Sequence, residues 1–83
     1  MTINLNTESS EQIILNYLFL NAEIFYKYSK LPNDFFEQSF FNDVFKSMKE
    51  LFKKDKSFDF YEVYLNSRVQ HMLSFNKFIY ALE

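Results

Sequence analysis

The chain has 83 residues with 9 basic and 11 acidic side chains, one histidine, one proline, and neither glycine nor cysteine. The lack of glycine excludes the loops that cradle phosphate, and the lack of cysteine excludes disulfides and thiolate chemistry. A net charge of −2 provides no overall positive field for a phosphate backbone, so direct nucleic-acid binding is not expected. Hydrophobic residues make up 48% of the chain, including 12 Phe and 6 Tyr, which is enough for one core.

The beginning of the chain is polar, so we expect residues 1–8 to form a flexible arm and residues 9–83 a single helical domain. There is no leader-like apolar segment, and no apolar run approaches the ~20 residues that span a bilayer. We therefore expect a cytoplasmic chain without a membrane segment. Ser9 and Gln12 have the spacing of a capping box, which predicts a helix that begins at Ser9 and ends near Leu20.

The next segment predicts a second short helix over residues 22–30, which Pro32 ends. Asn33-Asp34 is typical of a turn and precedes the pair Phe35-Phe36. We expect this turn to place a phenylalanine under the helices.

The strongest periodic pattern lies in residues 39–54 and predicts a long amphipathic helix. Its apolar residues recur at three- and four-residue spacing and are Phe41, Val44, Phe45, Met48, Leu51 and Phe52. Lys46, Lys49 and Lys53 fall on the opposite, solvent-facing side of the same pattern.

Two further helices follow in the C-terminal third. Asp59 and Glu62 again have capping-box spacing and predict a helix to Arg68 or beyond, and Ser74 can cap a last helix to Leu82. No segment alternates with the period of a strand. The fold class is therefore an all-α bundle of four to five short helices.

Catalytic equipment is not evident in the sequence. His71 is the single imidazole, and we interpret it as a surface or edge residue because no partner for it can be identified. The acidic residues are spread along the chain and fit turn and cap positions, so we expect no catalytic site, metal site or cofactor. Five lysines lie between Lys46 and Lys56 against Glu50 and Asp55, which indicates either a solvated helix face or a contact for an acidic partner.

A resemblance to a known family goes further. The succession of residues resembles the N-terminal domain of DnaB-type replicative DNA helicases over residues 10–65, through Glu11-Gln12, Ile14-Leu15, Leu18, Asp34-Phe35-Phe36, Val44-Phe45, Met48, Leu51 and Phe58-Asp59. The helicase-binding C-terminal domain of bacterial primase is similar too, through residues 15–23. Either resemblance implies a non-catalytic module that connects replicative helicase and primase.

Three alternatives stay open: a helicase-type domain, a primase-type domain, and a stand-alone regulator that binds the helicase. Self-association is a further option. Interfaces are enriched in large side chains and use charged rims, so the candidate partner-binding residues are surplus aromatics and lysines. They are Phe36, Phe40, Lys46, Lys49, Lys53, Tyr61 and Tyr64.

Overall fold

The computed structural model describes residues 7–82 and contains five α-helices and one 3₁₀ helix in that range. These are α1 (Thr7–Leu20), α2 (Ala22–Tyr28), α3 (Ser39–Asp55), α4 (Phe60–Asn66), η1 (Arg68–His71) and α5 (Phe75–Leu82). No strand occurs among the described residues, so the predicted all-α class is confirmed. Most of the predicted N-terminal arm, residues 1–6, lies outside the described residues.

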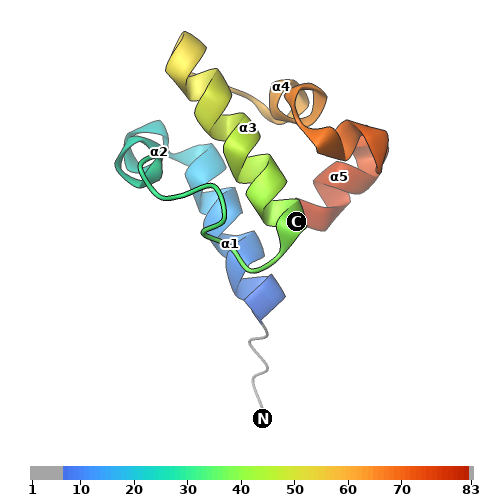
Figure 1. The fold of residues 1–83 in the computed structure, drawn as a ribbon. Coiled ribbons are helices and arrows are strands. Elements are labelled where there is room, and N and C mark those ends of the chain that lie inside the picture. The colour runs from blue at the N-terminus through green and yellow to red at the C-terminus, as the bar shows by residue number, and fades with distance from the viewer. Residues whose placement is uncertain (1–6, 83) are drawn as a thin grey trace.

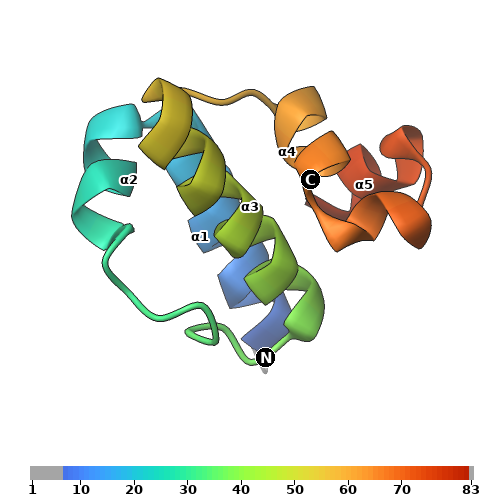
Figure 2. The same cartoon turned by 45° about the horizontal axis from the view of Figure 1, so that its top comes forward.

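Helices α1 and α3 lie side by side and run in the same direction (Figures 1 and 2). Helix α2 packs on one flank of this pair, and α4 and α5 pack on the other flank. The segment between α2 and α3 has to return along the pair before α3 can begin, because the two long helices are parallel. This return segment, residues 29–38, becomes part of the surface described below.

The core lies between these layers and takes residues from every helix. Its buried apolar residues are Leu15, Leu18, Phe25, Phe36, Phe41, Val44, Phe45, Met48, Val63, Val69, Phe78 and Leu82. The stripe predicted for residues 39–54 is confirmed, since its first four apolar residues are buried and Leu51 and Phe52 are half-buried. Phe36 is the buried member of the phenylalanine pair, and Phe35 is exposed.

Aromatic rings fill the centre by edge-to-face contacts. Phe25 of α2 lies 6.0 Å from Phe45, 5.2 Å from Phe52 and 5.0 Å from Phe58, measured between ring centroids. Such pairs each contribute about 0.5–1.5 kcal/mol beyond the burial of their apolar area. Most of the phenylalanine in this chain is therefore core material.

Helix ends follow the predicted caps in the C-terminal half and depart from them in the N-terminal half. Asp59 and Glu62 form the reciprocal capping box of α4, and the Ser74 hydroxyl accepts the Lys77 N–H in the first turn of α5. The Ser9 cap is wrong, because α1 begins at Thr7 and Ser9 lies inside the helix. Nothing in the polar start of α1 breaks a helix, and the N-terminus of a helix favours acidic residues.

Two helices end earlier than the sequence predicts. Helix α2 ends at Tyr28 and not at residue 30, because Ser29 and Lys30 already belong to the turn before Pro32. Helix α4 ends at Asn66, after which the Ser67 hydroxyl accepts the Val69 N–H and starts η1. Local side-chain hydrogen bonds therefore set this end.

Lys56 follows α3 in the left-handed conformation, with φ 61°, and its N–H donates to the Phe52 carbonyl over 2.8 Å. This position favours glycine because a Cβ atom is strained there. We expect Lys56→Gly to raise the free energy of unfolding by about 0.5 kcal/mol, as measured by urea denaturation. Lys54→Gly is the matched control and should lower it by ~1 kcal/mol, since Lys54 lies inside α3. Two changes of the same sign would contradict this account.

Candidate interaction surface

From Ile13 to Leu20, helix α1 is apolar around most of its circumference. Leu15 and Leu18 face the core, whereas Ile13, Tyr17 and Leu20 are 65%, 52% and 77% exposed. The three exposed residues are spaced four and three residues apart, so they form one stripe on the outer side of the helix. Residues 12–22, which include this stripe, contain no charged side chain.

An apolar groove of about 290 Å³ lies beside this stripe, between α1 and the return segment. Its lining residues are Ile13, Ile14, Tyr17, Leu18, Tyr28, Leu31, Phe35, Phe36 and Phe45. We define the groove face as the exposed apolar residues of this region: Ile13, Ile14, Tyr17, Leu20, Tyr28 and Phe35. A face of this kind is typical of a contact with another protein surface.

The last residues of the return segment, next to the start of α1, are held by a buried carboxylate. Glu11 is 7% exposed, and its two carboxylate oxygens accept the backbone N–H groups of Glu37 and Gln38 at 2.6 and 3.2 Å. Hydrogen bonds to an ionised acceptor are stronger than neutral ones. Glu11 therefore fixes the segment against the first turns of α1.

Two side chains of α3 fix the rest of this segment. The Asn42 amide accepts the Phe36 N–H and donates to the Phe36 carbonyl, both at 2.8 Å. The Lys49 ammonium donates to the Leu31 carbonyl at 2.8 Å and lies 4.9 Å from the centre of the Phe45 ring. Partial burial lowers the pKa of Lys49 below its ordinary value. The wall of the groove is thus held by side-chain hydrogen bonds at three points.

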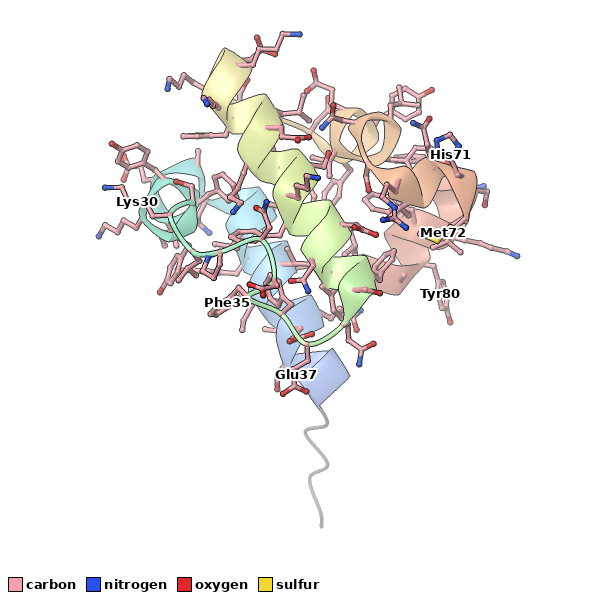
Figure 3. All side chains as sticks on the ribbon, in the orientation of Figure 1. Lys30, Phe35, Glu37, His71, Met72 and Tyr80 are labelled. Atoms are coloured by element: carbon pink, nitrogen blue, oxygen red, sulfur yellow. The ribbon has the colours of Figure 1, made fainter. Side chains whose placement is uncertain are left out.

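Charge is segregated along this wall. Figure 3 shows Lys30 near α2, Glu37 near the N-terminal half of α1, and Phe35 between them. Lys27 of α2 is also exposed, with the exposed Glu23 four residues before it, and Asp34 is an exposed acidic residue before Glu37. The return segment therefore has a lysine near its start and acidic residues toward its end.

A second set of exposed apolar residues lies on the other flank. We define the C-terminal face as Tyr61 and Leu65 of α4, Met72 after η1 and Tyr80 of α5. Figure 3 shows Phe35 on one side of the ribbon and Met72 and Tyr80 on the opposite side. The ring of Tyr61 is held in place by an edge-to-face contact with the ring of Phe75, and the two ring centroids lie 5.1 Å apart.

The structure separates the seven candidate residues that the sequence predicts. Phe36 lies in the core at the base of the groove, and Lys49 is engaged with the return segment, so neither projects freely. Lys46 and Lys53 are exposed on different parts of α3. Lys53 lines a cleft of about 280 Å³ with Tyr26, Ser29, Lys49, Phe52 and Lys56.

The three remaining candidates gather at the C-terminal flank. Tyr61 and Tyr64 stack at 6.4 Å, and both Tyr64 and Phe40 contact Phe78, at 5.4 and 6.3 Å. Tyr64 is half-buried, and its hydroxyl donates to the Leu73 carbonyl. Tyr61 therefore offers the exposed ring of this cluster and stacks on Tyr64, whereas Phe40 joins the cluster through Phe78.

Sequence reasoning missed the groove face. The signal was present in the run Ile13-Ile14-Leu15 and Tyr17-Leu18-Phe19-Leu20, which holds more apolar residues than one buried face of a helix can take. His71 is exposed on η1, as the sequence predicts.

Among the side chains that the structure describes, no three of His, Cys, Asp or Glu come close enough together to hold a metal ion. No helix in the same range has the length and hydrophobicity needed to cross a bilayer. Comparisons of the chain with protein families, with curated proteins and with solved structures find no match. The functional argument therefore depends on the surfaces of the five-helix domain itself.

Proposed function

We propose that this chain is a non-catalytic interaction module of the DNA replication machinery that mediates contact between replicative helicase and primase. The observation that carries this proposal is the pair of exposed apolar surfaces on opposite flanks of one small domain. Large apolar side chains left uncovered are characteristic of protein-binding surfaces. A module that connects proteins needs uncovered apolar side chains for its partners, and this domain has them on both flanks.

The choice of replication partners comes from the resemblance to the N-terminal domain of replicative helicases. Several residues that carry the resemblance meet at one place in this fold, since Glu11 binds the backbone directly after Phe36 and Phe45 contacts Phe36 at 5.5 Å. Their spacing in the sequence therefore corresponds to a physical unit, the anchored return segment. This supports a helicase-type domain, with a primase-type domain and a helicase-binding regulator as alternatives.

We assign the partner contact to the C-terminal face. It contains Tyr61, a large and amphipathic side chain that is 53% exposed and already held by aromatic neighbours. Aromatic residues that are fixed before binding lose little conformational entropy in an interface. Lys46 lies beside α4 and provides exposed charge that can speed encounter with an acidic partner, whereas Lys53 lies in the cleft with Tyr26 on the α2 side.

The test is size-exclusion chromatography with light scattering, in which the chain is mixed with the C-terminal domain of the cognate primase or with the hexameric helicase. Co-migration with primase supports a helicase-type module, and co-migration with the helicase supports a primase-type module or a regulator. Binding to neither at concentrations well above micromolar contradicts the proposed function.

Tyr61→Ala tests the assigned surface. We expect it to weaken the observed complex by at least about 30-fold, which corresponds to the loss of a ~2 kcal/mol hot spot. Tyr26→Ala is the matched control, because Tyr26 is 57% exposed and its ring lies 6.1 Å from that of Phe52, whereas Tyr61 has the two aromatic neighbours Tyr64 and Phe75. Equal losses in the two variants would contradict the assignment to the C-terminal face.

A further inference from the structure

We infer that the cleft between α2 and the C-terminal end of α3 binds a free nucleoside phosphate, with the base on an exposed aromatic ring and the phosphates on lysine ammonium groups. The cleft has a volume of about 280 Å³, which is near the lower end of the range for small-molecule sites. It lies on the α2 flank of the domain, away from the C-terminal face to which the partner contact is assigned. Its lining residues are Tyr26, Ser29, Lys49, Phe52, Lys53 and Lys56.

Positive charge is concentrated in this cleft. Three of its six lining residues are lysines, and none of the six is acidic. Lys49 and Lys53 are four residues apart and therefore share one side of α3, and Lys56 follows directly after that helix. Glu50 and Asp55 fall on other sides of α3 and do not line the cleft. A ligand in the cleft therefore meets ammonium groups, which bind phosphate as compact positive charges.

Lys49 is the partly buried lysine of the cleft. Its ammonium donates one hydrogen bond to the Leu31 carbonyl at 2.8 Å, and an ammonium has three donors, so this bond does not exhaust its capacity. Burial lowers the pKa of Lys49 because the charged form has lost part of its hydration. An anion beside this ammonium compensates for the lost water. Lys53 and Lys56 are exposed and supply the other two charges.

Two aromatic rings form the apolar part of the cleft. The ring centroids of Tyr26 and Phe52 lie 6.1 Å apart, and Tyr26 is 57% exposed. The Lys56 ammonium lies 5.8 Å from the centre of the Phe52 ring, so positive charge stands directly beside the ring pair. Exposed aromatic side chains next to positive charge are the usual means of holding a base and its phosphate together. Both requirements of a nucleotide are therefore met within one cleft.

The rest of the chain favours a single nucleotide over a nucleic-acid strand. The net charge of −2 provides no extended positive field for a phosphate backbone, and a cleft of about 280 Å³ suits a compact ligand. Glu23 of α2 and Asp55 of α3 are exposed outside the cleft, where they would repel further phosphates. The chain has no glycine, so phosphate contacts have to come from side chains such as these lysines.

The experiment is a titration of the full chain with ADP at low ionic strength, followed by amide chemical shifts in NMR and by calorimetry. We expect saturable shifts at the cleft residues and an affinity that falls as salt is added. Adenosine lacks the phosphates and inorganic pyrophosphate lacks the base, so each should bind at least about tenfold more weakly than ADP. Equal affinities for ADP and pyrophosphate, or for ADP and adenosine, would overturn the inference.

Lys53→Glu tests the phosphate contact. We expect it to weaken ADP binding by at least about tenfold, because a negative charge replaces a positive one inside the cleft. Lys54→Glu is the matched control, since it changes the net charge equally at an exposed neighbouring position of α3 that does not line the cleft. Equal losses in the two variants would show a response to net charge alone and would overturn the inference.

Tyr26→Ala tests the base contact. It should weaken ADP binding by at least about fivefold and leave pyrophosphate binding unchanged, because only ADP has a base to stack. Tyr28→Ala is the control, since Tyr28 is 48% exposed on the same helix and lines the apolar groove instead of the cleft. An unchanged ADP affinity in Tyr26→Ala would overturn the inference.

Two further outcomes would also overturn it: no saturation at millimolar ADP, or a single-stranded DNA oligonucleotide that binds the cleft more tightly than ADP does. These titrations contain neither helicase nor primase, so a negative result leaves the proposed function intact. A chain that binds ADP in the cleft but neither of those proteins would contradict the proposed function alone.

Discussion

Phe45→Ala is expected to lower the free energy of unfolding by about 3–5 kcal/mol, the usual loss for a fully buried phenylalanine. Phe45 has no exposed surface, and its ring contacts Phe25 at 6.0 Å and Phe36 at 5.5 Å. The substitution leaves a cavity where α2, α3 and the return segment meet. A domain of this length has a total stability of only ~4–12 kcal/mol, so the loss removes a large share of it and should clearly lower the urea concentration at the unfolding midpoint.

Urea denaturation followed by the helical circular dichroism signal measures this effect. Phe35→Ala is the matched control, because Phe35 is exposed and should lose less than ~1 kcal/mol. If the two phenylalanine variants are equally stable, the assignment of Phe45 to the centre of the core is wrong.

Glu11→Ala has the second largest expected effect, a loss of about 2–4 kcal/mol in the free energy of unfolding. The carboxylate is buried and accepts two backbone N–H groups, and hydrogen bonds to a charged group contribute ~1.5–3 kcal/mol each in favourable cases. Removing it leaves the N–H groups of Glu37 and Gln38 without their acceptor. Glu11→Gln should lose less, because one amide oxygen remains to accept.

Amide hydrogen exchange gives this prediction a local measurement. We expect exchange at Glu37 and Gln38 to accelerate by about tenfold or more in Glu11→Ala, as the segment opens without unfolding the whole domain. Glu37→Ala is the control, because it removes an exposed side chain and keeps the backbone N–H that binds Glu11. Unchanged exchange at both amides in Glu11→Ala would contradict the anchoring role of Glu11.

Local patterns predicted the elements that depend on neighbours in the sequence. Helix α3 followed its apolar spacing, and α4 began at the capping box of Asp59 and Glu62, because both features act within a few residues. The errors at Ser9 and at the ends of α2 and α4 also concern a few residues. At the ends of α2 and α4, the hydroxyls of Ser29 and Ser67 form hydrogen bonds with nearby backbone groups, and apolar spacing does not encode these contacts.

The candidate surface was harder to predict because exposure is a property of the assembled fold. Phe35 and Phe36 are adjacent and chemically identical, yet one is exposed at the groove and the other is buried beneath it. Lys49 belongs to the predicted polar side of α3, but its ammonium meets the Leu31 carbonyl 18 residues earlier. Such contacts depend on how α2 and α3 are placed, which local spacing does not encode.

The sequence by itself determined the all-α class, the long helix α3 with its buried stripe, and the lack of glycine- or cysteine-dependent chemistry, since composition and short-range periodicity decide these features. Only the tertiary structure decided which side of the apolar second half of α1 is covered, that Glu11 anchors a segment 26 residues away, and that exposed apolar residues lie on both flanks. The reason is physical: which apolar residues become buried depends on the packing of distant elements around one small core, and those left over form the surface that can bind.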